Sequence, residues 1–332
     1  MLPFRCLVVV VTMLSTSSSL HAQLSADSIA KAQQYSARNN GRAMIIQEGG
    51  DLRFEKYYNG YSKGEPLHIY SGTKSFFGVL AVIAEEDGLL SLEERVAETV
   101  TEWRDDPKKN QITIRETLNF TSGLETGFEE IYGRGSEDKI SRAVGLDATR
   151  ERGESFIYGP GNMNIFCEVL RRKLKPKRLS YEEYLGRKLL RPLDIQVSRW
   201  REDAHGNPMP SAGMYMTGQE WLKFGEMINA GGRFGMKQIV KTENLRKCFE
   251  ATSTIENNSD VSLNIVSPVV DNENTDLFLK VAIPDSGNMD LNMPVVGLPT
   301  GVMSLHINQG YETMALFTPI IENPAIPLHI GG

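Results

Sequence analysis

Cysteine, histidine and net positive charge are all scarce in this chain of 332 residues. Three cysteines cannot build a disulfide scaffold, and the sequence leaves open whether Cys167 and Cys248 pair. The five histidines form no cluster with the spacing of metal ligands, so we expect no metal site. With 36 basic against 42 acidic residues the formal net charge is −6, which argues against a nucleic-acid partner.

Long apolar runs are also missing, apart from one near the beginning of the chain. The run Cys6–Leu14 follows a single positive charge, Arg5, and leads through a serine-rich stretch to Ala22. This pattern is typical of an export signal, so we expect residues 1–22 to be removed from a periplasmic or secreted protein with no remaining membrane span. The run is short for a bilayer span, and an uncleaved membrane anchor is the alternative.

Strand patterns lie towards both ends of the chain, with helical patterns between them. A helix is expected over Ser25–Ser36, and Ala43–Gln47 with Leu52–Tyr58 predicts a hairpin with one buried face. From Thr73 onward, apolar residues recur at helical spacing. The pattern over residues 90–195 is mostly helical, with a fresh helix start at Ser91 and loops near 122–138 and 152–163. Strand-like runs then return at Val261–Val269, Leu277–Ala282, Gly301–Ile307 and Glu312–Thr318. This order favours one sheet built from both ends, with a helical region inserted.

A serine and a lysine lie three residues apart where the predicted hairpin gives way to the apolar helix. On a helix, residues with this spacing share a face, so Ser71 is expected beside the Lys74 ammonium. A serine hydroxyl is a poor nucleophile until a base takes its proton, and a desolvated lysine has a lowered pKa. Ser-x-x-Lys alone also fits a helix cap followed by a surface lysine, but its place at a strand-to-helix junction favours catalysis.

Four stretches of the chain match known motifs. Ser71–Phe76 is similar to S-x-T-K-S-F, and Glu86–Glu93 is similar to E-D-G-x-L-S-L-D. Ile112–Leu124 is similar to I-T-I-R-x-L-L-x-H-T-S-G-L, and Ser211–Thr217 is similar to S-A-G-G-L-x-S-T. In these motifs and in their order, over roughly residues 40–320, the chain resembles the penicillin-recognising serine hydrolases, in particular the branch of class C β-lactamases, DD-carboxypeptidases, family VIII-type esterases and 6-aminohexanoate-dimer hydrolases.

By this resemblance Tyr158 is the second catalytic group, in the place of the family's Y-x-N motif. A positive Lys74 nearby is expected to favour the phenolate, which would take the Ser71 proton or relay one to the leaving group. The family's asparagine is Pro160 here, so one substrate contact is missing. Asn162 and Asn164 lie close in sequence, and Asn162 is the candidate substitute.

The family's third motif, K-T-G or H-T-G on a strand beside the serine, is degenerate. Its place falls either at Val295–Gly297 or at Pro299–Gly301, so the candidate residues for the oxyanion-binding and substrate-binding strand are Gly297, Thr300 and Gly301. Neither position brings Lys or His, and His306 is expected to be an ordinary strand residue. A backbone N–H of an oxyanion hole, worth roughly 3–4 kcal/mol, survives such a change. The lost cation would have held a substrate carboxylate for about 1.5–3 kcal/mol.

The resemblance implies an α+β protein of the β-lactamase/DD-peptidase fold over residues 23–332. An antiparallel sheet flanked by helices would occupy about 23–80 and 196–332, with an all-helical lobe at about 81–195. The implied activity is that of a serine hydrolase that uses an acyl-enzyme and no cofactor on a small-molecule ester, amide or peptide. The missing cation favours esters or amides. A DD-carboxypeptidase or β-lactamase, and a non-catalytic binding protein that keeps the fold, are the alternatives.

Overall fold

The computed structural model describes residues 26–38, 41–48, 51–133, 138–249, 270–271, 274–275 and 302–308. The predicted signal segment lies outside these ranges, as do the third-motif candidates Gly297, Thr300 and Gly301. The same is true of the predicted strands Val261–Val269, Leu277–Ala282 and Glu312–Thr318.

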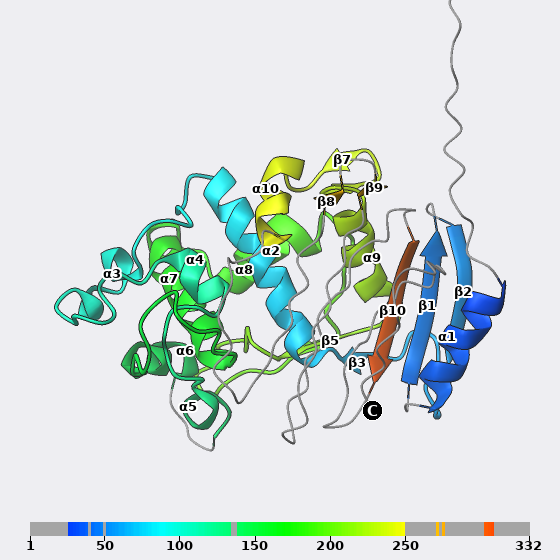
Figure 1. Cartoon of the computed structure of the whole chain (residues 1–332), viewed down its shortest axis with the longest axis horizontal. Coiled ribbons are helices and arrows are strands. Elements are labelled where there is room, and N and C mark those ends of the chain that lie inside the picture. Colours follow the sequence, from blue (N-terminus) through cyan, green and yellow to red (C-terminus); the bar gives the residue numbers. More distant parts are fainter. Residues whose placement is uncertain are drawn as a thin grey trace, which may run out of the picture.

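An antiparallel sheet joins an early and a late segment of the chain. Its strands are β1 (Gly41–Glu48), β2 (Asp51–Tyr57) and β10 (Val302–Asn308), in the order β10-β1-β2. Ile45 of the central strand lies opposite Leu305 of β10. The predicted hairpin and the predicted strand near residue 301 are therefore confirmed, and they belong to one sheet (Figure 1).

Helices cover both faces of this sheet because β1 is apolar on both sides. Met44 and Ile46 are buried against α1 (Ala26–Arg38), the helix predicted near the N-terminus. Ala43 points to the opposite face, since side chains alternate along a strand, and belongs to the main core. The contacts of α9 (Gly218–Asn229) with β1 and β10 cover that second face.

The long helix α2 (Thr73–Glu86) runs through the middle of the molecule, between the sheet and the helices farther from it (Figure 1). The positions that predicted it are all buried, namely Phe76, Phe77, Leu80, Ile83 and Ala84. Val79, Ala81 and Val82 are buried as well, so the helix is apolar around most of its circumference, as expected for a helix enclosed by protein. Its first turn is therefore held on a rigid element.

A second, smaller sheet brings distant segments to the start of α2. Its strands are β3 (Leu67–His68), β5 (Met214–Met216) and β4 (Arg199–Trp200), in the order β3-β5-β4. The antiparallel pairing of β3 with β5 sets the segment before Ser71 beside the segment that follows Ser211.

All regular elements that the structure describes between residues 87 and 195 are helical. They are α3 (Val96–Thr99), η2 (Thr101–Trp103), α4 (Ile114–Leu118), α5 (Phe128–Tyr132), α6 (Lys139–Arg142), η3 (Ala143–Gly145), α7 (Pro160–Leu174), η4 (Lys175–Lys177), α8 (Tyr181–Leu185) and the π-helical turn η5 (Gly186–Leu190). The division into two lobes at residues 80 and 195 stays a prediction.

Two local predictions in this region are wrong. No helix begins at Ser91; its N–H is bonded to the Glu94 carboxylate in a turn, and the next helix begins at Val96. The expected loop near 152–163 ends at Gly159, because Pro160 occupies the first turn of α7, where a missing N–H costs no helical hydrogen bond.

The remaining described elements are small and lie after α9. They are the hairpin β6 (Arg233–Phe234) and β7 (Lys237–Gln238), α10 (Thr242–Arg246), η6 (Lys247–Phe249), and the hairpin β8 (Val270–Asp271) and β9 (Asn274–Thr275). Within the residues searched, none of the helices has the length and apolar character needed to cross a membrane.

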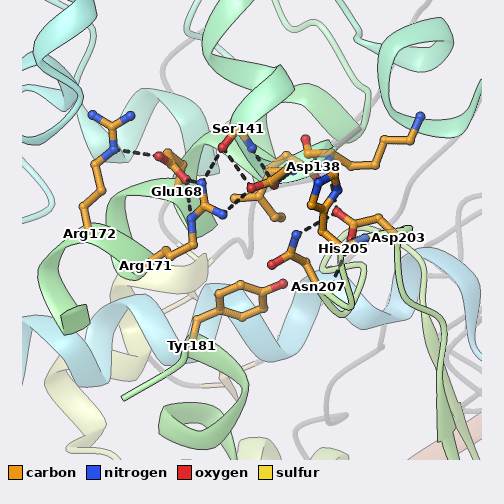
Figure 2. A network of polar contacts seen from close by, with 12 residues as sticks. Asp138, Ser141, Glu168, Arg171, Arg172, Tyr181, Asp203, His205 and Asn207 are labelled. Carbon is orange, nitrogen blue, oxygen red and sulfur yellow. Dashed lines mark hydrogen bonds and ion pairs between the residues drawn. The ribbon is translucent and has the colours of Figure 1, made fainter. Parts of the chain in front are cut away.

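A network of charged side chains fastens α7 to its neighbours (Figure 2). The buried carboxylate of Glu168 lies 2.6 Å from Arg171 and 2.6 Å from Arg172. Arg171 also reaches Asp138, and Arg172 reaches Glu102. A buried carboxylate is costly unless it is paired, and two guanidinium groups pair this one. The network therefore anchors the helix that directly follows Tyr158.

The two cysteines whose pairing the sequence left open are not joined by a disulfide. Cys167 is buried within α7, and Cys248 is exposed in η6. Burial raises the pKa of the Cys167 thiol, and the neighbouring Glu168 adds to this. Cys167 thus packs as a small apolar side chain.

Candidate active site

The segment between β3 and α2 places Ser71 at the start of the central helix. A single turn of 3₁₀ helix, η1 (Tyr70–Gly72), leads directly into α2. Tyr70 has a φ of 45°, in the left-handed region that residues other than glycine seldom adopt. Such backbone strain is tolerated where surrounding contacts impose it, and it is common next to reactive groups.

Contacts with β5 impose this geometry. The Ile69 N–H donates to the Met214 carbonyl at 3.1 Å, and the Met214 N–H donates to Thr73 Oγ1 at 3.2 Å. Thr73 in turn donates to the carbonyl of Tyr70 at 2.7 Å. The buried hydroxyl of Thr73 therefore ties the strained residue, the helix start and the neighbouring strand together.

Ser71 and Lys74 lie together as their spacing predicts. Lys74 Nζ is 3.0 Å from Ser71 Oγ and donates a second hydrogen bond to the carbonyl of Ser211 at 2.6 Å. The lysine is 8% exposed. None of the carboxylates that the structure describes forms an ion pair with it. Burial without a counter-charge lowers the pKa of Lys74 to about 7. About half of the lysine is therefore a neutral amine at neutral pH, in contact with a serine hydroxyl.

Tyr158 lies next to this pair. Its ring centroid is 5.0 Å from Lys74 Nζ. Its hydroxyl is buried, and no well-formed hydrogen bond reaches it from the described residues. Burial raises the pKa of Tyr158, the proximity of Ser71 offsets this in part, and Tyr132 adds to it. The prediction that Lys74 stabilises the phenolate of Tyr158 is therefore wrong. Burial has the largest effect on the pKa of Tyr158, which is a neutral phenol at neutral pH.

Two phenylalanines flank Tyr158. The ring centroid of Phe120 is 5.1 Å from that of Tyr158, and Phe156 is stacked on Tyr158 at 6.3 Å. Phe120 has a φ of 59°, and its carbonyl accepts the Ile157 N–H at 2.8 Å, which holds the loop that carries Tyr158. Both phenylalanines are partly exposed, so their rings present apolar surface beside the ring of Tyr158.

Asn162 is placed away from solvent. It is 1% exposed; its Oδ1 accepts a hydrogen bond from Ser122 at 2.5 Å, and its amide faces the Ile157 carbonyl at 3.5 Å. Asn164 is buried as well and donates to the Lys139 carbonyl. The burial of Asn162 and its bond to Ser122 do not support its predicted contact with a substrate, and Asn164 is likewise turned into the protein. Pro160, in the place of the family's asparagine, supplies no polar side chain.

The third motif cannot be placed beside Ser71, because Gly297, Thr300 and Gly301 lie outside the described residues. Their assignment to the oxyanion and substrate strand stays a prediction. His306 lies on β10 and pairs through its backbone with Met44 of β1, which agrees with its interpretation as a strand residue.

Sequence reasoning missed three residues that position Lys74 or the segment beside it, namely Ser211, His68 and Tyr132. Ser211 acts through its backbone carbonyl, and only its place in the S-A-G stretch pointed to it. His68 Nε2 lies 2.5 Å from the Ala212 carbonyl, and the His68 ring stacks on Tyr215 at 4.4 Å. Tyr132 reaches Ser211 across the fold, and no sequence pattern indicated it.

The described residues contain no group of three or more His, Cys, Asp or Glu side chains arranged for a metal ion. The loop around His205 is a tight turn closed by a carboxylate. Asp203 accepts the N–H groups of His205 and Asn207 at 2.9 and 3.0 Å, as a side chain does in a tight turn (Figure 2).

Comparisons with known proteins agree on the family. The sequence profile of the Beta-lactamase family matches residues 26–253, a range that includes Ser71, Lys74 and Tyr158. No curated protein matches the chain significantly.

Solved structures with the same fold include proteins with several activities. A protein assigned as a beta-lactamase from Bacteroides dorei DSM 17855 has a TM-score of 0.55 at 22% identity, covering 66% of this chain and 67% of its own. One assigned as a 6-aminohexanoate-dimer hydrolase from Bacillus anthracis has a TM-score of 0.55 at 18% identity, covering 64% and 60%. EstCE1, a hydrolase with promiscuous acyltransferase activity, has a TM-score of 0.54 at 14% identity, covering 66% and 75%.

These likenesses establish a shared β-lactamase-type fold of mixed α and β structure, and the profile match extends over more than half of the chain. The chain therefore belongs to the Beta-lactamase family of penicillin-recognising serine hydrolases.

Proposed function

We propose that this protein hydrolyses a neutral ester or amide, with esters preferred, through an acyl-enzyme on Ser71. The observation that carries the proposal is the 3.0 Å contact between Lys74 Nζ and Ser71 Oγ. Burial lowers the pKa of this lysine to about 7, which provides a base poised for operation near neutral pH.

In the acylation step, neutral Lys74 takes the Ser71 proton as Oγ attacks the carbonyl carbon of the substrate. The new C–O bond turns the carbonyl oxygen into an oxyanion. First-turn N–H groups of a helix have no partner within the helix, so the Ser71 N–H is suited to hold this oxyanion. We assign the second donor to the predicted strand near Gly297–Gly301.

The neutral phenol of Tyr158 then serves as a proton donor. As the bond from the carbonyl carbon to the leaving group breaks, Tyr158 gives its proton to the leaving oxygen or nitrogen and recovers one from the Lys74 ammonium. Water attacks the resulting ester in the same manner, with its proton taken up through Lys74 and Tyr158. The acid is released and Ser71 regains its proton.

Three features favour an ester over a β-lactam or peptide. Pro160 cannot hydrogen-bond a substrate amide, and Asn162 is buried and engaged with Ser122. The rings of Phe120 and Phe156 present apolar surface beside Tyr158. The third-motif candidates contain no Lys or His to hold a substrate carboxylate.

One observation supports a second candidate, a DD-carboxypeptidase or β-lactamase. The positive charge of Arg201 opposes the burial that raises the pKa of Tyr132, and it contributes to the lowered pKa of His68. The exposed guanidinium of Arg201 thus acts electrostatically on both Tyr132 and His68. It could take the role of the missing cation for a substrate carboxylate.

A substrate panel separates these candidates. We expect kcat/KM for p-nitrophenyl butyrate to exceed that for nitrocefin and for a D-Ala-D-Ala peptide by at least about 100-fold, because one missing charge-assisted contact and one missing amide contact together remove about 3 kcal/mol. Faster turnover of nitrocefin or the peptide, lost in Arg201→Gln, would favour the second candidate. Absence of turnover and of any covalent adduct would indicate a non-catalytic binding protein.

The activity is expected to depend on pH through Lys74. Its amine must be neutral to accept the Ser71 proton, so kcat/KM for p-nitrophenyl butyrate should fall about tenfold per pH unit below a midpoint near pH 7. Stopped-flow rates between pH 5 and 9 measure this midpoint. A midpoint below pH 5 or above pH 9 would contradict the assignment of Lys74 as the base.

A further inference from the structure

Tyr132 is the last residue of α5 and is 38% exposed, yet its hydroxyl end is directed into the protein. The hydroxyl donates a hydrogen bond to Ser211 Oγ at 3.0 Å, across 79 residues of sequence. Burial raises the pKa of Tyr132 to about 12, so the phenol keeps its proton throughout the working range. It is therefore a fixed donor at this position.

Ser211 connects this phenol to the candidate base. The residue is fully buried: its side chain accepts from Tyr132, and its backbone carbonyl accepts from Lys74 Nζ at 2.6 Å. A residue held at its side chain cannot rotate its carbonyl freely. The hydrogen bond from Tyr132 therefore constrains the atom that accepts the lysine.

The residues after Ser211 are held from the other side. Ala212 offers its carbonyl to His68 Nε2 at 2.5 Å, and the N–H of Met214 donates to Thr73 Oγ1. Gly213 has no room for a side chain, because a Cβ there would lie 2.6 Å from the Met209 carbonyl and 2.6 Å from the Trp200 ring. Two residues before Ser211, the Met209 N–H donates to the Arg201 carbonyl and the Met209 carbonyl accepts from Trp200 Nε1, both at 2.8 Å. Within the described residues, Tyr132 is the partner that holds the Ser211 side chain itself.

We propose that Tyr132 is a positioning residue for Lys74, which acts through the Ser211 hydroxyl to set the carbonyl that aligns the lysine with Ser71. The inference rests on the proposed function in one respect, the use of Lys74 as the base. Its chemistry involves no further proton transfer, since Tyr132 holds a hydrogen bond and touches no reacting atom.

The charged and titratable groups around Lys74 define what the test must separate. Tyr158 faces the amine from the loop before α7, and Tyr132 approaches through Ser211 from α5. Arg201, after β4, acts electrostatically on Tyr132 and on His68 of β3, and His68 contacts the Ala212 carbonyl next to Ser211. Removing the Tyr132 hydroxyl leaves every other group in place, so a change at Lys74 reports the tie itself.

The test compares Tyr132→Phe, Ser211→Ala and the double variant. Each single change is expected to lower kcat for p-nitrophenyl butyrate about 5- to 20-fold with KM changed less than twofold. The double variant should be no slower than the slower single, because both changes break one connection. The acid limb of the pH profile should move to lower pH by about half a unit, since a displaced carbonyl no longer stabilises the ammonium.

Tyr184→Phe is the matched control. Tyr184 lies on α8, away from Lys74, and its hydroxyl donates a hydrogen bond to Asp87 at 2.7 Å. It should alter stability without moving the acid limb. Additive losses in the double variant, or an acid limb that stays in place, would overturn the proposal and leave Tyr132 a merely structural residue.

A second readout does not depend on turnover. In protein carrying ¹³C at the lysine ε carbons, with the Lys74 signal assigned by Lys74→Met, the titration midpoint of Lys74 should fall by the same half unit in Tyr132→Phe. If the wild type hydrolysed no ester but this midpoint shifted, the proposed function would fail while the positioning role stood. An unchanged midpoint in an active enzyme would refute the positioning role alone.

Discussion

Replacing Ser71 by alanine is expected to lower kcat/KM for p-nitrophenyl butyrate by about 10⁴-fold or more, the scale seen when the nucleophile of a serine hydrolase is removed. The change deletes only the hydroxyl at 3.0 Å from Lys74 Nζ and leaves the helix start intact. No other serine in the described residues lies within hydrogen-bond distance of that amine through its side chain. The loss should therefore appear as a failure to form the acyl-enzyme.

Mass spectrometry measures this step directly. Wild-type protein quenched during turnover of a slowly released ester should carry the acyl mass on the peptide that contains Ser71, and Ser71→Ala should carry none. Ser75→Ala, one helical turn later on α2, is the matched control and should keep activity within about twofold. Persistent turnover in Ser71→Ala, or an adduct on another residue, would exclude Ser71 as the nucleophile.

Replacing Lys74 by methionine is expected to raise the free energy of unfolding by about 2 kcal/mol at pH 7 while it abolishes ester hydrolysis. Lys74 has a folded-state pKa of about 7, against a value of about 10.4 in an unfolded chain. Between these values the unfolded state binds one more proton, so the stability of the wild type rises with pH across this window. Below pH 7 the buried ammonium therefore costs about 5 kcal/mol relative to high pH.

Methionine fills a similar volume and removes this cost. The hydrogen bonds to Ser71 and to the Ser211 carbonyl are lost in exchange, for about 1 kcal/mol each. The gain should be largest below pH 7. It should give way to a small loss above about pH 10, where the unfolded-state lysine also becomes neutral and only the two lost hydrogen bonds count. A gain in stability together with a loss of activity is expected when a buried active-site charge that destabilises the fold is removed.

Urea unfolding at pH 7 and pH 10 measures the two free energies. Lys237→Met, at an exposed position on β7, is the control and should stay within about 0.5 kcal/mol of the wild type at both pH values. A destabilised Lys74→Met at pH 7, or a gain of equal size at both pH values, would contradict the buried, readily deprotonated lysine on which the mechanism depends.

Local patterns predicted the elements that carry the site. The recurrence of Phe76, Phe77 and Leu80 predicted α2, and the alternation around Leu52–Tyr58 predicted the hairpin. In both cases the pattern reflects a face that the element itself must bury, so a single sequence suffices. The helix start predicted at Ser91 was wrong by five residues: the Glu94 carboxylate accepts the Ser91 N–H in a turn, and the helix begins at Val96.

The candidate site divides in the same way. The spacing of Ser71 and Lys74 placed them in contact because both lie on one helical turn. Resemblance placed Tyr158 beside them, but the direction of its pKa shift was mistaken. That direction depends on how much water the folded chain excludes, which segments remote in sequence decide. Asn162 was a reasonable candidate by sequence. Its burial also depends on remote segments, and it appears only in the folded structure, where Asn162 packs against Ser122.

By itself the sequence determined the family and the contact of Ser71 with Lys74, because these depend on residue type and on spacing within one helix. Only the tertiary structure decided that Lys74 is desolvated, that its second partner is the backbone carbonyl of Ser211, and that Tyr132 holds that residue. A carbonyl group is the same at every position of the chain, and burial is a property of the assembled fold. The burial of a charged side chain such as Lys74 depends on segments remote in sequence, so no local residue pattern indicates it.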